Sequence, residues 1–228
     1  MGPEEGGTDT FTHPSCEWCI QNPCMNEIHT MGKLAIVGAG NVGQAIAGHM
    51  TLLGHQVRLY SRWEREFEAI TANGGIELSG DVEGRAAKPL LTTDLGTAVH
   101  GADTIIVAAP AFAHAYLSEQ LAALLEPGQL VVFQPSVLGS SLELARHFAA
   151  VRRPACLIAE TPTSLYTCRL RGPAQVYIGA IKQAVQLATI PHNACSQALA
   201  RLRPYFGDRY VAGTDTLSVG LGNCNAIY

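Results

Sequence analysis

Three glycines at a fixed spacing are the residues of this sequence whose types could best support chemistry. Gly38, Gly40 and Gly43 form the pattern Gly-x-Gly-x-x-Gly. An apolar run at 33–37 precedes them, and a segment with helical apolar spacing follows as far as Gly54. In a strand–turn–helix unit, the first glycine permits the sharp turn, the second leaves room for a pyrophosphate, and the third lets the helix pack against the strand. The pattern predicts a dinucleotide site at the amino end of the helix.

The surrounding sequence supports this prediction against a chance match. In a glycine-rich chain the same pattern can be a simple turn followed by a helix cap. Here a predicted strand comes before the pattern and a predicted helix after it, and a second apolar strand at 56–60 follows the helix-ending Gly54. This order is the context that the dinucleotide interpretation requires.

The composition narrows the class of protein. The 228 residues are 47% hydrophobic and 15% charged, with a net charge of -4, so a large core is expected and a nucleic-acid partner is not. No apolar run reaches the roughly 20 residues of a membrane-spanning helix, and no secretory signal is recognised. The seven cysteines lack a disulfide framework spacing, which fits a reducing compartment. We therefore expect a cytoplasmic protein without a membrane partner.

Strand and helix patterns alternate from residue 31 onward. This order predicts an α/β fold, a Rossmann-type doubly wound parallel sheet with right-handed crossovers. We expect residues 1–30 to be a flexible extension, residues 31–213 to form the nucleotide-binding domain, and residues 214–228 to begin a new helical segment. The predicted strands are 34–37, 57–60, 104–108, 130–133, 155–159, 176–178 and 210–211, with a small hairpin from 76–78 and 85–91. The predicted helices are 41–53, 62–73, 94–101, 113–125, 140–150 and 193–202.

Ligands of an open parallel sheet bind beyond the carboxyl ends of its strands. An acidic residue after the second strand would bind the adenosine 2′-hydroxyl of NAD, whereas an arginine favours the 2′-phosphate of NADP. Arg62 holds this position, so NADP is slightly favoured over NAD, although Glu64 and Glu66 weaken the preference and Arg62 could be a solvated charge. The candidate cofactor residues are Gly38, Gly40, Asn41, Val42, Gly43, Ser61, Arg62, Ala109, Pro110 and Gln134.

Three other positions have competing interpretations. His114 follows the Pro110 turn, and we interpret it as a solvated histidine on a helix surface. Ser140 follows a glycine after a strand but lacks the Gly-x-Ser-x-Gly pattern, so we interpret it as a helix cap. Arg169 follows Cys168 in an expected proline-containing loop, where it could clamp a substrate carboxylate or form a structural ion pair.

The first thirty residues contain a possible metal-binding pattern. The spacing is that of a zinc knuckle with its usual histidine and last cysteine exchanged. We favour an extension without metal, and no metal ligand is assigned. The residues concerned are Cys16, Cys19, Cys24 and His29, with His13 nearby.

Five segments resemble the opine dehydrogenase family, the octopine and nopaline dehydrogenase type that includes bacterial metallophore synthases. The opening segment is shared with glycerol-3-phosphate dehydrogenases and ketopantoate reductases, whereas the last two segments are specific to opine dehydrogenases. The resemblance runs from about residue 31 to the end. The segments are KLAIVGAGNVGQAIAGHMTLLGHQVRLYSR, TIIVAAPAFAH, LVVFQPS, AETPTSLYTCRLRG and LSVGLGNCNAIY.

The resemblance implies an oxidoreductase that joins an amino acid to a 2-oxo acid and reduces the imine with NADH or NADPH. It places the glycines and Asn41 at the pyrophosphate, Arg62 at the adenosine ribose, and Pro110 and Gln134 on the nicotinamide side. Asn225 matches the asparagine that opens the catalytic helix. The family's catalytic histidine would come one residue after Tyr228, so we expect a cofactor-binding half that is inactive alone and prone to associate, for instance as a homodimer.

Two other hypotheses remain open. One is an enzyme similar to glycerol-3-phosphate dehydrogenase or ketopantoate reductase, which would lack the Tyr166-x-Cys168-Arg169 segment. The other is a dinucleotide-binding module without catalysis. The amino acid and the oxo acid used are not fixed by the sequence.

Overall fold

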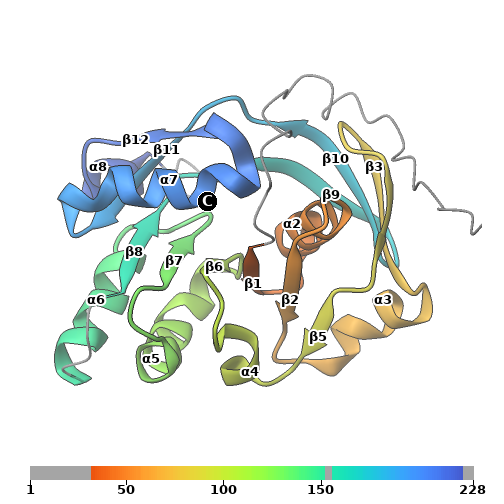
Figure 1. Ribbon diagram of the computed structural model, residues 1–228, viewed down its shortest axis with the longest axis horizontal. Helices are drawn as coiled ribbons and strands as arrows, with labels where there is room; N and C mark the ends of the chain where they lie inside the picture. Colours follow the sequence, from red (N-terminus) through yellow and green to blue (C-terminus); the bar gives the residue numbers. More distant parts are fainter. Residues whose placement is uncertain (1–31, 152–155, 223–228) are drawn as a thin grey trace, which may run out of the picture.

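The computed structural model describes residues 32–151 and 156–222, which build two sheets and the helices around them (Figure 1). The larger sheet has eight strands and the smaller has four. The large sheet contains, in spatial order, β12 (Tyr210–Ala212), β11 (Val185–Ile190), β8 (Leu157–Glu160), β7 (Leu130–Phe133), β6 (Thr104–Val107), β1 (Lys33–Val37), β2 (Gln56–Tyr60) and β5 (Leu90–Thr92).

The strand order of the large sheet places a topological switch point between β1 and β6. From β1 the chain builds β2 on one side, and later returns to build β6, β7 and β8 on the other. All neighbouring strands run parallel except β11, which runs antiparallel to β8. Both β6 and β7 are buried along their whole length, as expected for strands covered on both faces. The doubly wound sheet is confirmed, with one antiparallel pair.

Helices cover both faces of the large sheet (Figure 1). On one face, α2 (Asn41–Leu52) and α7 (Cys195–Phe206) pack on a core that includes Ile36 and Ile106. On the other face, α4, α5 and α6 pack on a second core. These helices span Leu95–Val99, His114–Leu124 and Ser140–Val151.

The small sheet covers the side of α2 that faces away from the large sheet. Its spatial order is β4–β3–β10–β9. Leu78, Val176 and Ile178 from this sheet join the core beneath α2, so α2 is buried from both sides. The strands are β3 (Gly75–Gly80), β4 (Gly84–Ala87), β9 (Tyr166–Gly172) and β10 (Gln175–Ile181).

The structure differs from the predicted elements at several places. Two strands were missed, β9 and β11, and Arg169 therefore lies in a strand instead of an irregular loop. The predicted helix at 62–73 is a 3-10 helix, Glu64–Phe67, followed by the short α3, Glu68–Ala72. The last helix, α8, spans Thr216–Leu221. The predicted extension at 1–30, its cysteines, and Asn225 lie outside the described residues.

Candidate dinucleotide site

The glycine turn leaves β1 with the geometry that its spacing predicts. Gly38 has φ +117°, a conformation that side chains disfavour, and a Cβ there would lie 2.7 Å from the carbonyl oxygen of Ala108. A Cβ on Gly43 would overlap the carbonyl oxygen of Gly38. Both glycines are therefore required for the close packing of α2, β1 and the end of β6.

Gly40 differs from the other two glycines because a Cβ there would meet nothing within 4 Å. It is the N-cap residue of α2, and no side chain caps this helix. The first turn of α2 also carries no acidic residue. The positive end of the helix dipole thus faces open space without a neutralising group, an arrangement that suits a phosphate anion.

Asn41 and Val42, the first residues of α2, contact other parts of the chain. The Oδ1 atom of Asn41 accepts a hydrogen bond of 2.8 Å from the backbone N–H of Leu170 in β9. Val42 packs against the core beneath α2. The sequence-predicted pyrophosphate residues are therefore together at the amino end of α2, and the Asn41 side chain holds β9 beside them.

Arg62 follows β2 and lies between two exposed aromatic rings. Its guanidinium carbon is 4.8 Å from the ring centre of Trp63 and 5.8 Å from that of Tyr116. Such stacking orients a cation without neutralising it. Arg62 is thus more than a freely solvated charge. Neither aromatic residue was predicted from the sequence as part of the site, although Trp63 directly follows Arg62.

Ser61 serves the local turn, because its hydroxyl binds Glu66 and accepts a 3.1 Å hydrogen bond from the N–H of Trp63. The Glu66 carboxylate is therefore brought back to the end of β2. A carboxylate so close to Arg62 is relevant to the choice between the two dinucleotides.

His114 is buried, so its interpretation as a solvated histidine was wrong. Its side chain joins the loops that follow β6 and β7. Nε2 lies 3.0 Å from the carbonyl oxygen of Ala109, and Nδ1 lies 2.9 Å from the Ser140 hydroxyl. A carbonyl can only accept, so Nε2 carries the proton of the neutral ring. Burial lowers the pKa of His114, which favours this neutral form.

Ser140 begins α6, and its hydroxyl also contacts the backbone of Val137, with the N–H at 3.0 Å and the carbonyl oxygen at 2.8 Å. The hydroxyl thus binds the turn that precedes α6 instead of an N–H of the first helical turn, so the cap interpretation was wrong. Pro110, by contrast, is exposed at the start of its loop. The histidine bridge therefore fixes the loop whose outer surface carries Pro110.

Gln134 follows β7 but is fully buried. Its Oε1 atom accepts a hydrogen bond from the hydroxyl of Tyr210. Its Nε2 atom has no partner among the described residues. The side chain thus points into the protein beneath the strand ends.

Arg169 lies in the edge strand β9, opposite Tyr177 of β10. Its neighbours Cys168 and Leu170 both contact Asn41. Because strand side chains alternate, Arg169 faces the other side, where Arg171 stacks on Tyr177 at 3.5 Å. The structure brings its backbone near the glycine turn and leaves its side chain exposed.

A family model described as ketopantoate reductase PanE/ApbA matches residues 34–189. The chain belongs to this family. The chain is also 34% identical over 194 residues to an opine dehydrogenase of Arthrobacter sp. (strain 1C), covering 85% of this chain and 54% of that protein. It is 31% identical over 163 residues to the protein ocs of Agrobacterium vitis, covering 70% of this chain and 44% of that protein. The resemblance to opine dehydrogenases is confirmed.

Solved structures share the fold of this PanE/ApbA family member. A structure of octopine dehydrogenase with NADH and L-arginine has a TM-score of 0.73 at 21% identity, covering 84% of this chain and 51% of that one. NADP+-bound yersinopine dehydrogenase has a TM-score of 0.66 at 19% identity, covering 85% and 50%. These likenesses confirm the Rossmann-type fold. The chain spans about half the length of the curated relatives it matches.

Within 32–151 and 156–222, no helix is long and apolar enough to cross a membrane. In the same ranges, no group of three or more His, Cys, Asp or Glu residues could hold a metal ion.

Proposed function

We propose that this chain is the dinucleotide-binding part of an NAD(P)-dependent oxidoreductase of the opine dehydrogenase type. The observation that carries the proposal is the glycine turn, where Gly38 and Gly43 permit close packing and Gly40 leaves space in front of an uncapped helix. The relation to the Arthrobacter opine dehydrogenase supports the reaction type. The reaction would join an amino acid to a 2-oxo acid and reduce the resulting imine.

Within this proposal, each group of site residues has its own task. The amino end of α2 holds the pyrophosphate, through the backbone of Gly40 to Gly43. The bound dinucleotide supplies the hydride. The loop of Ala109 and Pro110, fixed by His114, borders the nicotinamide side, and Gln134 supports that edge from beneath. These assignments rest on the strand ends at which the residues lie.

The dinucleotide is proposed to be NADP in preference to NAD. The guanidinium of Arg62 lies beside the rings of Trp63 and Tyr116, and a guanidinium suits a 2′-phosphate. Glu66, close to Ser61, opposes this preference. A balance between one cation and one anion predicts a modest preference and not an absolute one.

The domain assignment is part of the same proposal. We assign residues 31–213 to the nucleotide-binding domain and residues 214–228 to the start of a helical domain that contains Asn225 and supports catalysis. The half-length match to the relatives is consistent with this division. We propose that this chain alone binds the dinucleotide without turnover. For Arg169, the proposed contact with a substrate carboxylate would be made from the exposed face of β9, because its side chain faces away from Asn41.

Fluorescence titration with NADPH and with NADH tests the proposal. Saturable binding of either compound is expected. Arg62→Gln should weaken NADPH by about tenfold, the loss of one charge-assisted contact, and change NADH by less than twofold. Arg65→Gln is the matched control, because Arg65 also stacks on Trp63, at 5.3 Å, from the next turn. Absence of binding to both compounds would refute the dinucleotide site, and equal losses for both compounds in Arg62→Gln would refute the assignment to the 2′-phosphate.

A second enzyme class has specific support. Glycerol-3-phosphate dehydrogenase of Thermoanaerobacter sp. (strain X514) is 34% identical over 100 residues, covering 44% of this chain and 30% of that protein. An NADPH-dependent assay of this chain with dihydroxyacetone phosphate tests this second class, because the first proposal expects no turnover by the chain alone. A mixture of amino acids and 2-oxo acids is the control substrate. Oxidation of NADPH with the phosphate substrate alone would favour this second class.

A further inference from the structure

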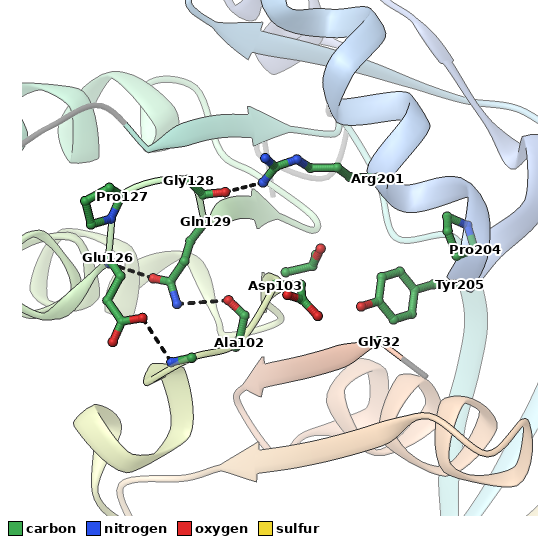
Figure 2. Close-up of a pocket in the computed structure, with 12 residues that line it drawn as sticks. Gly32, Ala102, Asp103, Glu126, Pro127, Gly128, Gln129, Arg201, Pro204 and Tyr205 are labelled. Carbon is green, nitrogen blue, oxygen red and sulfur yellow. Dashed lines mark hydrogen bonds between the residues drawn. The ribbon is translucent and has the colours of Figure 1, made fainter. Parts of the chain in front are cut away.

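A cavity of about 470 Å³ opens at the edge of the large sheet opposite the glycine turn. It lies at the amino ends of β1, β6 and β7, and α7 forms its remaining wall (Figure 2). Cavities that hold small ligands commonly measure about 300–1,000 Å³. The proposed dinucleotide site does not include this cavity.

The floor of the cavity is fixed by polar groups that are already satisfied. The Gln129 amide accepts from the N–H of Glu126 at 2.8 Å and donates to the carbonyl oxygens of Val99 and Ala102 at 2.7 and 2.9 Å. The Glu126 carboxylate binds His100 at 2.6 Å. It also accepts from the N–H of Gly101 at 3.1 Å (Figure 2). These contacts tie the loops before β6 and β7 together and hold the shape of the cavity.

Two opposite charges line the same cavity and still have free bonding capacity. Asp103 uses one carboxylate oxygen to accept from the N–H of Lys33 at 2.9 Å, and its other oxygen has no hydrogen-bond partner among the described residues. Arg201 donates from one nitrogen to the carbonyl oxygen of Gly128 (Figure 2). Within the described ranges, no ion pair of 4 Å or less joins Asp103 to Arg201. A ligand that carries both charges can therefore bridge them.

We propose that this cavity binds an α-amino acid, with its carboxylate on Arg201 and its ammonium group on Asp103. A guanidinium presents parallel donors that match a carboxylate, and a carboxylate oxygen is the acceptor that an ammonium group requires. The lining holds two carboxylates, Asp103 and Glu126, against one guanidinium, so the local field favours a basic side chain. The affinity should follow the order lysine, alanine, glutamate.

Isothermal titration of the full chain with L-lysine, n-butylamine and butyrate tests the bridging. Each of the last two compounds carries only one of the two charges. L-lysine should bind at least tenfold more tightly than either compound, because both contacts are then made at once. Equal affinity for L-lysine and n-butylamine, or no binding of L-lysine at tens of millimolar, would overturn the proposal.

Two variants test whether L-lysine binds in this cavity. Asp103→Asn keeps an oxygen that can accept from Lys33, and Arg201→Met keeps the apolar stem, so both should fold, which circular dichroism would verify. Each should weaken L-lysine at least tenfold. Arg203→Met is the matched control on the same helix, because Arg203 pairs with Asp208 and does not line the cavity. L-lysine binding that survives both cavity variants would show that the amino acid binds elsewhere.

Discussion

The two ends of β1 and β6 carry two kinds of candidate site. At the carboxyl ends, the geometry comes from the backbone, since Gly38 and Gly43 permit a close approach and Gly40 leaves open space. At the amino ends, the cavity is defined by side chains, chiefly Asp103 and Arg201. A site formed by the backbone is sensitive to the addition of a single methyl group. A site formed by charged side chains loses affinity each time one of those charges is removed. The two ends of one sheet should therefore respond very differently to mutation and to pH.

The largest effect is expected where the backbone packs most closely. In Gly43→Ala, the new Cβ would overlap the carbonyl oxygen of Gly38 and push α2 away from β1. Overpacking of this kind should lower the free energy of unfolding by about 3 kcal/mol and reduce dinucleotide binding below detection. Urea denaturation and fluorescence titration measure the two effects. Wild-type stability in this variant would show that the turn can accept a Cβ, which would contradict the close packing seen in the structure.

The next largest effect is expected from the buried side chain of His49, which should make the free energy of unfolding depend on pH. Burial, with the nearby charges of Arg209 and His55, lowers the pKa of His49 to about 3, from 6.5. The folded state therefore favours the neutral ring. The contribution of the neutral His49 ring to the free energy of unfolding is complete above pH 6.5. It is lost as the pH falls toward 3, by up to about 1.4 kcal/mol per pH unit.

Urea denaturation between pH 7 and pH 4 measures this loss. In His49→Gln, the titrating group is absent while a polar contact with the Tyr166 hydroxyl, 2.7 Å from His49, remains available. The variant should show a shallower dependence on pH than the wild type. Parallel profiles for the two proteins would refute the prediction.

A smaller and more selective effect is expected at Gly40. The residue has φ -76°, an ordinary value, and a Cβ there meets no protein atom within 4 Å. Gly40→Ala should leave the free energy of unfolding within about 0.5 kcal/mol of the wild type while weakening NADPH by about tenfold or more, because the methyl group occupies the space assigned to the phosphates. Binding as tight as in the wild type would place the phosphates elsewhere.

The smallest effect is expected at Arg169. Its side chain is exposed on the outer face of the small sheet, away from the face that meets Asn41. Arg169→Ala should change NADPH affinity by less than twofold in the fluorescence titration. A loss similar to that of Gly40→Ala would assign this arginine to the cofactor in place of the substrate.

Local signals allowed much of the fold to be predicted. The glycine turn depends on residues within a few positions of one another, and Asp94 caps α4 through the N–H of Thr97, three residues away. The missed strand β11 lacks such a signal, because its register against β8 pairs residues about thirty positions apart, such as Ala188 with Glu160.

The same limit applied to the candidate site. The burial of His114 depends on Ser140, and that of Gln134 depends on Tyr210, 76 residues along the chain. No spacing in the sequence connects such pairs. The predicted strand ends indicated which residues lie at one edge of the sheet. Which of those side chains are buried depends on tertiary packing, which the sequence pattern does not show. The roles assigned to the individual cofactor residues, to Arg169 and to Asn225 remain predictions.

The hydrogen bond between Asn41 and Leu170 has a consequence for dynamics. The Leu170 N–H lies on the outer edge of β9, where an amide without an acceptor would exchange its hydrogen with solvent rapidly. Its acceptor is a side chain at the first position of α2. Exchange at this amide therefore requires the glycine turn and β9 to separate. The rate of hydrogen–deuterium exchange at Leu170 should report how often the two move apart.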